Sequence, residues 1–360
     1  MSREDWGPGT RAVHAGLPEP ERGQPFLPGP TLAAPYHLPG DPAGAEYVYG
    51  RYGNPTWSRY EAALAGLEGG EAVVFASGMA AITAVLYVFV EDARGPVVVP
   101  DDGYFMTRRV AARLGAAVGV EVRLVSTDTD AITNALDGAR LVIVETPSNP
   151  GLDVCDIAAV AEAARVAGAA LAVDNTLATP LRQRPLQLGA DLSVSAGTKA
   201  LTGHADLMLG HVAARDPDHA EALRAWRRQT GSIPGPFEVW LAHRSLATLG
   251  VRLERQEAVA RALVGLLGAR DDVADVRHPD VAGVLGFDAG GRARAEAFLA
   301  ACELVIEATS FGGVHTTAER RARWSGDDVP EGWVRLSAGV EDAADVCADV
   351  ARALDATAGR

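Results

Sequence analysis

One lysine, Lys199, stands among the 33 basic residues of this 360-residue chain, and all the others are arginine. An arginine guanidinium stays protonated, whereas a lysine amine can lose its proton and form an imine with an aldehyde. Composition alone could leave one lysine by chance, so its neighbours decide the interpretation. Lys199 ends the segment Ser195-Ala196-Gly197-Thr198-Lys199, which lies downstream of a strand-like run that ends in Asp174. This arrangement makes Lys199 the candidate for Schiff-base catalysis.

Polar residues also follow the apolar runs that precede Lys199. They are Ser77-Gly78-Met79, Asp101 to Tyr104, Glu145 to Asn149 and Asp174 to Thr176. The carboxyl ends of strands in an open parallel sheet form a ligand crevice, so these segments are expected to converge. Gly78 and Met79 open a predicted helix, and the free N–H groups of a helix N-terminus suit a phosphate. The pattern predicts one ligand site that contains Lys199.

The elements that position these residues are short apolar runs that alternate with alanine-rich helical stretches. The runs cover residues 72–77, 96–102, 121–126, 141–147, 170–176, 192–199 and 207–214. This alternation is typical of βαβ units and predicts an α/β fold with a mainly parallel sheet and helices on both faces. The first strand–helix turn lacks GxGxxG, so a dinucleotide-binding protein is not indicated.

Three regions are expected along the chain. Residues 1–47 are rich in Pro and Gly and predict an extended N-terminal arm, too long for an ordinary loop and expected to lie across another subunit. Residues 48–233 are predicted to form the α/β domain that holds the site. Residues 234–360 begin with a long helical stretch and continue into short strands and a closing helix, which predicts a smaller α+β domain.

The composition of the chain limits which kinds of partner it can bind and in which cellular compartment it is expected. The net charge of −14 argues against nucleic acid or an anionic membrane as a partner. The first ten residues have no signal-peptide pattern, and the longest apolar run, residues 80–90, is too short to span a bilayer. Three widely spaced cysteines favour reduced thiols over a disulfide framework, so a cytoplasmic location is expected. The eight histidines show no metal-ligand spacing, and no metal is predicted.

Seven short motifs resemble those of one known enzyme family. They are YVYGRYGNPT (47–56), SGMAA (77–81), ETPSNP (145–150), VDNTLATP (173–180), TKALTGHAD (198–206), SFGG (310–313) and RLSAGVED (335–342). The chain is similar to the pyridoxal-phosphate-dependent enzymes of Cys/Met metabolism. That family includes cystathionine γ-synthase, cystathionine β- and γ-lyases, methionine γ-lyase and O-acyl-homoserine sulfhydrylases. The likeness runs from TRAVHAG (10–16) into the last predicted helix. It implies the type I, aminotransferase-like fold, pyridoxal 5′-phosphate as cofactor, and a homotetramer built from two active-site dimers.

The resemblance and the chemistry of the residues assign the same roles around the cofactor ring. Lys199 would hold the cofactor as a Schiff base and then move protons, which requires a pKa below the usual value of about 10.4. Asp174 would pair with the pyridinium nitrogen, and a buried carboxylate without such a partner would be costly. By resemblance, Tyr104 stacks on the ring and serves as an acid for the departing sulfur, and Asn149 lies near the phenolic oxygen.

Further residues are assigned by resemblance to the phosphate and the substrate. The backbone of Gly78 and Met79 and the hydroxyl of Thr198 would bind the phosphate. Tyr49 and Arg51 would reach the same phosphate from the neighbouring subunit, so that a monomer would have an incomplete site.

The substrate α-carboxylate would be bound by Arg335 together with Ser310, and the planar guanidinium suits that bidentate task. Apolar neighbours in Trp333-Val334-Arg335-Leu336 predict that Arg335 is partly buried.

One departure from the family pattern concerns the phosphate. The family often has serine three residues before the cofactor lysine, where this chain has Ala196. Ser195 is the candidate that could compensate for the missing hydroxyl.

Other departures concern the substrate. Phe105-Met106 replaces Gly-Gly or Gly-Cys after the tyrosine, so the cysteine of many methionine γ-lyases is absent. Thr309 stands where many cystathionine-processing members carry Glu, and it favours a smaller thioether such as methionine or homocysteine. His315 and residues 319–323 remain candidates for recognising a distal carboxylate.

These observations predict a carbon–sulfur lyase that converts methionine, homocysteine or cystathionine to 2-oxobutyrate, ammonia and a thiol by γ-elimination. The main alternative is a γ-replacement enzyme, either a cystathionine γ-synthase or an O-acyl-homoserine sulfhydrylase, which would use the same residues. A hypothesis of a different class is a non-catalytic, cofactor-binding regulatory protein, for which Ala196 is the sole support.

Overall fold

The computed structural model describes residues 6–90 and 95–358 and contains two sheets. The larger sheet has the strand order β1-β7-β6-β5-β4-β2-β3. Its strands are β1 (Glu71–Phe75), β2 (Val97–Pro100), β3 (Val122–Val125), β4 (Leu141–Glu145), β5 (Ala170–Asp174), β6 (Leu192–Ser195) and β7 (Gly210–Ala214). β7 pairs antiparallel with both β1 and β6, and the remaining pairs are parallel. The predicted α/β fold with a mainly parallel sheet is confirmed.

Helices cover both faces of this sheet, because its strands are apolar on both sides. Val97 and Val99 of β2 join the core beneath α3 and α4, whereas Val98 between them joins the core beneath α5 and α6. This is the burial expected of parallel strands with near-continuous hydrophobic runs. The helices are α2 (Pro55–Glu68), α3 (Gly78–Val90), α4 (Phe105–Val118), α5 (Thr129–Asn134), α6 (Ile157–Ala167), α7 (Thr179–Arg182) and α8 (Pro217–Thr230).

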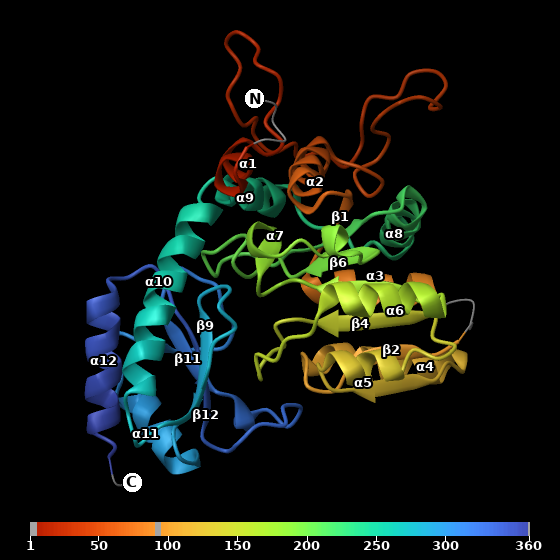
Figure 1. Cartoon of the computed structure of the whole chain (residues 1–360). Coiled ribbons are helices and arrows are strands. Elements are labelled where there is room, and N and C mark those ends of the chain that lie inside the picture. Colours follow the sequence, from red (N-terminus) through yellow and green to blue (C-terminus); the bar gives the residue numbers. More distant parts are fainter. Residues whose placement is uncertain (1–5, 91–94, 359–360) are drawn as a thin grey trace.

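The smaller sheet has the strand order β10-β11-β12-β9-β8 and lies beside the larger one (Figure 1). Its strands are β8 (Ala274–Arg277), β9 (Val284–Asp288), β10 (Ile306–Glu307), β11 (Thr317–Arg320) and β12 (Trp333–Ser337). The helices α11 (Arg292–Ala301) and α12 (Ala343–Asp355) and the long α10 (Leu249–Gly268) pack on it around a separate apolar core. The short 3-10 helix η3 (Arg321–Arg323) follows β11 directly.

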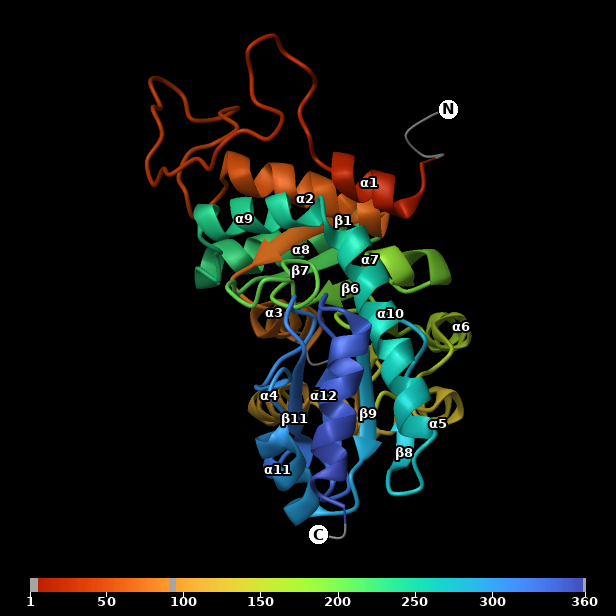
Figure 2. The same ribbon diagram turned by 90° about the vertical axis from the view of Figure 1, so that its left-hand side faces the viewer.

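The expected boundary at residue 233 falls between α8 and α9 (Pro236–Leu246). α9 packs against α2, in the same core as residues of the larger sheet, and α10 then runs down to the smaller sheet (Figures 1 and 2). The single long helical stretch expected after residue 234 is thus two helices, with a break at residues 247–248.

The N-terminal segment contains the short helix α1 (Pro8–His14), followed by irregular chain to residue 54. An isolated bridge joins Pro35 to Tyr49 within this segment. Figure 1 shows its loops extending away from the layered body. Among the described residues, no helix has the length and apolar character needed to cross a membrane.

Candidate active site

A cavity of about 390 Å³ lies between the two sheets, at the carboxyl ends of the parallel strands. This volume is in the range of small-molecule sites. Among its walls are residues at the ends of β1, β4, β5 and β6 and residues from the smaller sheet. The predicted site residues along it are Gly78, Met79, Tyr104, Asn149, Asp174, Thr198, Lys199, Thr309, Ser310 and Arg335. Segments that are far apart in the sequence therefore meet around Lys199.

Lys199 is held from the side of the smaller sheet. Its Nζ donates a hydrogen bond of 2.6 Å to Ser310 Oγ and lies 4.8 Å from the centre of the Phe311 ring. Burial lowers the pKa of Lys199 to about 8, and the nearby Arg335 and Arg321 guanidinium groups act in the same direction. The amine can therefore lose its proton near neutral pH, as Schiff-base chemistry requires.

The turn that carries Lys199 is fixed by an arginine that the sequence interpretation did not single out. Arg252 of α10 donates to the carbonyl oxygens of Ala200, at 2.5 Å, and Leu201, at 3.2 Å. The Thr198 hydroxyl donates to the Leu209 carbonyl at 3.1 Å and accepts from the Leu209 N–H at 3.0 Å. Both contacts pin the backbone on either side of Lys199, and a buried arginine in an amphipathic helix gives no sequence signal of this role.

Asp174 is the last residue of β5, and only one of its two carboxylate oxygens accepts hydrogen bonds among the described residues. Its Oδ1 accepts from the Thr176 N–H at 3.0 Å and from the Thr176 hydroxyl at 2.5 Å. No hydrogen bond to Oδ2 is found among the described residues. Burial raises the pKa of Asp174, although the two bonds from Thr176 act in the opposite direction. The free oxygen is available to a cationic or N–H partner in the cavity.

Glu145 is a second buried carboxyl beside Asp174 that was not predicted as a site residue. The two residues are paired in register on β4 and β5. Burial and the charge of Asp174 raise the pKa of Glu145 well above its usual range. Its Oε2 accepts a 2.6 Å hydrogen bond from the backbone N–H of Tyr104. Glu145 therefore anchors Tyr104, and its position at a strand end was the available sequence signal.

The N-terminus of α3 forms the opposite wall. The N–H groups of Gly78 and Met79 precede the first complete helical turn and have no intrahelical carbonyl partner. Gly78 also needs its lack of a side chain, since a Cβ there would stand 2.5 Å from the Cβ of Ala196. Ala196 thus packs tightly against Gly78 at the start of the helix.

Arg335 is buried on β12, facing the cavity. It donates from Nη1 to Asn149 Oδ1 and from Nη2 to the Ser310 carbonyl at 2.8 Å. Glu319, its in-register partner on β11, lies 3.4 Å away. Burial lowers the pKa of Arg335 to about 9, and the neighbouring Arg321 contributes to this shift. The arginine stays charged at neutral pH and is positioned for a carboxylate.

Three predicted site residues do not lie along this cavity. Ser195 is buried on the strand, in register with His211, and its Oγ has no hydrogen-bond partner among the described residues. Successive side chains of an extended chain point to opposite sides, so Ala196 lines the cavity and Ser195 does not. Tyr49 is 44% exposed, and Arg51 donates to the Arg228 carbonyl at 2.6 Å on the outer surface. Within one chain, none of the three reaches Lys199.

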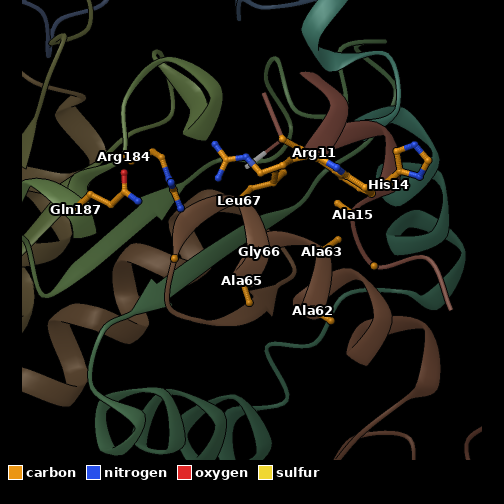
Figure 3. Close-up of a pocket in the computed structure, with 13 residues that line it drawn as sticks. Arg11, His14, Ala15, Ala62, Ala63, Ala65, Gly66, Leu67, Arg184 and Gln187 are labelled. Carbon is orange, nitrogen blue, oxygen red and sulfur yellow. The ribbon is translucent and has the colours of Figure 1, made fainter. Parts of the chain in front are cut away.

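A different cavity, of about 580 Å³, lies between α1, α2 and the segment that follows α7. Figure 3 shows Arg11 and Arg184 pointing toward one another across it. The Nε atoms of both arginines are buried without a hydrogen-bond partner in the described part of the chain. None of the predicted site residues lines this cavity, and it offers no amine that can be deprotonated, so we place the active site at Lys199.

The residues around Lys199 fit pyridoxal phosphate. The free N–H groups of Gly78 and Met79 can bind its phosphate, the free Asp174 oxygen can pair with its ring nitrogen, and Lys199 can bind its aldehyde carbon. The Thr198 hydroxyl donates its single proton to the Leu209 carbonyl, so it would bind the phosphate only by turning that proton toward it. The fit rests on complementary donor and acceptor groups in one cavity.

Comparison with known proteins identifies the family. Residues 10–355 match the family described as Cys/Met metabolism PLP-dependent enzyme. A putative cystathionine gamma-lyase of Streptomyces coelicolor is 53% identical, over 98% of this chain and 94% of that protein. A methionine gamma lyase from Micromonospora echinospora, solved in its apo form, has a TM-score of 0.90 at 36% identity, covering 98% of this chain and 100% of that chain. Cystathionine gamma synthase from Xanthomonas oryzae pv. oryzae, in complex with cystathionine, has a TM-score of 0.92 at 32% identity, covering 98% of each chain. The chain belongs to the family of pyridoxal-phosphate-dependent enzymes of Cys/Met metabolism.

Proposed function

We propose that this enzyme is a carbon–sulfur lyase that removes the γ-substituent of a sulfur amino acid. With cystathionine and water, the products would be cysteine, 2-oxobutyrate and ammonia. With methionine or homocysteine, the leaving group would be methanethiol or hydrogen sulfide. The observation that carries the proposal is Lys199, whose pKa is lowered to about 8, hydrogen-bonded to Ser310 in the cavity that Arg335 also lines. The relative at 53% identity bears the name putative cystathionine gamma-lyase, which favours elimination.

Pyridoxal phosphate, when bound, supplies an electron sink for the bonds broken at the substrate Cα and Cβ. Arg335 binds the α-carboxylate and so fixes the orientation of Cα. Lys199 removes the proton from Cα and then the proton from Cβ, and Ser310 positions its Nζ. Tyr104 is positioned by Glu145 to protonate the sulfur as the Cγ–S bond breaks.

The alternative is γ-replacement, in which a thiol adds where elimination would release product. It is supported by relatives named cystathionine gamma-synthase, one of them from Mycobacterium tuberculosis at 36% identity over 97% of each chain. The same residues serve both reactions. The discriminating experiment is product analysis from O-succinyl-L-homoserine with and without L-cysteine. Net formation of cystathionine would replace the lyase assignment, whereas 2-oxobutyrate from L-cystathionine supports it.

Attachment of the cofactor is tested in the same preparation. Borohydride reduction and peptide mapping should place the added cofactor mass on Lys199, with no competing site because the chain has a single lysine. A protein that binds cofactor there but releases no ammonia from any sulfur amino acid would instead be a regulatory cofactor-binding protein.

We further propose a homo-oligomer in which Tyr49 and Arg51 complete the site of a second copy. Their distance from the Lys199 cavity within one chain supports this arrangement, as does the exposure of Tyr49. Mixing two inactive variants, Arg51→Ala and Lys199→Ala, under conditions that exchange subunits tests it. Recovery of activity is expected, because hybrid dimers contain one site with both residues intact. No recovery, despite subunit exchange shown by a mass-tagged copy, would contradict it.

A further inference from the structure

Arg321 lines the Lys199 cavity, although the proposed reaction gives it no task. Its side chain belongs to η3 and is 3% exposed. Arg335 already supplies a guanidinium for the substrate α-carboxylate. A buried guanidinium is costly to remove from water, so a second one in the cavity wall requires partners that compensate its charge.

Two acidic residues hold the Arg321 side chain in one position. Its Nη1 donates to Glu319 Oε2 at 2.7 Å, and its Nε donates to Asp327 Oδ2 at 2.8 Å. Its Nη2 lies 2.5 Å from the same Asp327 oxygen. A guanidinium carries five N–H groups, and these contacts use at most three of them. At least two donors remain on a side chain whose position is fixed and which faces the cavity.

Glu319 is shared between Arg321, Arg335 and the more exposed Arg323, whose Nη2 lies 3.2 Å from Glu319 Oε1. It also lies 3.4 Å from Arg335 Nη2 and accepts from Trp324 Nε1 at 2.8 Å. The negative charge of Glu319 is therefore not available to Arg321 alone. The guanidinium groups of Arg321 and Arg335 lie close together in the described lining of the cavity. Both of them act to lower the pKa of Lys199. Both guanidinium groups line the cavity, whereas the carboxylates that pair with them, Glu319 and Asp327, do not.

The connection between β11 and β12 determines from which side Arg321 enters the cavity. Arg108 of α4 donates to the Gly326 carbonyl in this connection and to the Gly103 carbonyl at 2.7 Å. Gly326 also packs on Phe105, because a Cβ at residue 326 would stand 2.5 Å from that ring. Since α4 starts directly after Tyr104, Arg321 approaches from the side where sulfur is expected to leave.

The donors of Arg321 distinguish substrates by the group beyond sulfur. Methionine ends in a methyl group, which would cover these donors without accepting a hydrogen bond. Cystathionine continues beyond sulfur to a second carboxylate, which can accept from both. A site built to hydrogen-bond a substrate group rejects analogues that lack it, because its buried donors are then left without partners.

We propose that Arg321 binds the distal carboxylate of the substrate and thereby selects amino-acid thioethers that carry a second carboxylate over methionine. This deepens the proposed function and rests on it. The assignment differs from the expectation drawn from Thr309, which favoured a smaller thioether. Thr309 lines the same cavity but is uncharged, whereas Arg321 adds a fixed cation at the leaving-group end.

The first test measures binding without turnover, using the holoenzyme and two amino acids that have no sulfur to lose. L-2-aminosuberate has the length and both terminal carboxylates of cystathionine, and L-norleucine has the shape of methionine. Dissociation constants, measured by spectroscopic titration of the holoenzyme, are expected to favour L-2-aminosuberate by about 10- to 100-fold, the range for one charge-assisted hydrogen bond out of water. Equal constants in the unaltered enzyme would overturn the proposal without any variant.

The second test asks whether Arg321 is responsible for the preference. Arg321→Gln should lower the ratio of kcat/KM for L-cystathionine to that for L-methionine by about 10- to 100-fold, and Arg321→Lys should recover part of it. Arg292→Gln is the control: Arg292 on α11 does not line the cavity and pairs with Glu296 between exposed side chains, so the ratio should stay within about twofold. An unchanged ratio in Arg321→Gln would overturn the proposal and leave the lyase assignment intact.

The two proposals fail in different ways. An enzyme that releases 2-oxobutyrate from none of these amino acids contradicts the proposed function, yet the dissociation constants of the two analogues still report on Arg321. If Arg321→Gln does not fold, Asp327→Asn frees one edge of the guanidinium while keeping its charge. In that variant the preference for L-2-aminosuberate should change by at least about threefold, and an unchanged preference would contradict the role of a fixed Arg321.

Discussion

Replacing Glu319 by glutamine should strongly destabilise the smaller sheet and its contact with the active site. Its carboxylate is 1% exposed and neutralises two buried guanidinium groups, Arg321 at 2.7 Å and Arg335 at 3.4 Å. Removing one partner of a buried ion pair costs about 3–5 kcal/mol, because the remaining charge stays out of water. The glutamine amide has nearly the same volume, so the loss reports charge and not a cavity.

Equilibrium urea unfolding, followed by tryptophan fluorescence, measures this loss as a lower midpoint at an unchanged slope. Glu307→Gln is the control, since Glu307 pairs with Arg323 at 3.1 Å between two exposed side chains. Such surface pairs contribute about 0–1 kcal/mol. If Glu319→Gln lowered the free energy of unfolding by no more than Glu307→Gln, the charge balance inferred for the two arginines would be wrong.

Three further outcomes are expected. In the cofactor-free protein the pKa of Lys199, about 8, lies below its value in the unfolded chain. Between about pH 8 and 10.5 the unfolded chain therefore binds more protons, and the free energy of unfolding should rise with pH. This rise, measured by urea unfolding, should disappear in Lys199→Met. Arg335→Lys should raise KM for every amino acid substrate about 10-fold or more, because an ammonium cannot replace the bidentate guanidinium; an unchanged KM would remove Arg335 from the carboxylate site. Gly78→Ala should weaken cofactor binding, measured by titration of absorbance, because the added Cβ would meet Ala196 at 2.5 Å; unaltered affinity would refute the tight packing at the start of α3.

The single lysine, the strand pattern and the polar residues at strand ends were enough to predict the fold class and the region of the site. Parallel strands that share one sheet must bring their carboxyl ends to one edge, so the sequence alone groups Asp174, Asn149 and Tyr104 with Lys199. This inference needs only local patterns and one topological rule. The roles of these residues remain predictions to be tested chemically.

Tertiary structure decided the features that depend on register and on distant segments. Ser195 ends β6 and Ala196 follows it directly, yet only Ala196 lines the cavity, because successive side chains of an extended chain point to opposite sides. Glu145 stands beside Asp174 because β4 and β5 pair in that register. The buried charges of Glu319 and Arg321 reach Lys199 from more than 100 residues away, and no local pattern encodes such a contact. Their physical basis is the contact between Arg108 of α4 and the connection from β11 to β12, which the packing of the whole chain determines.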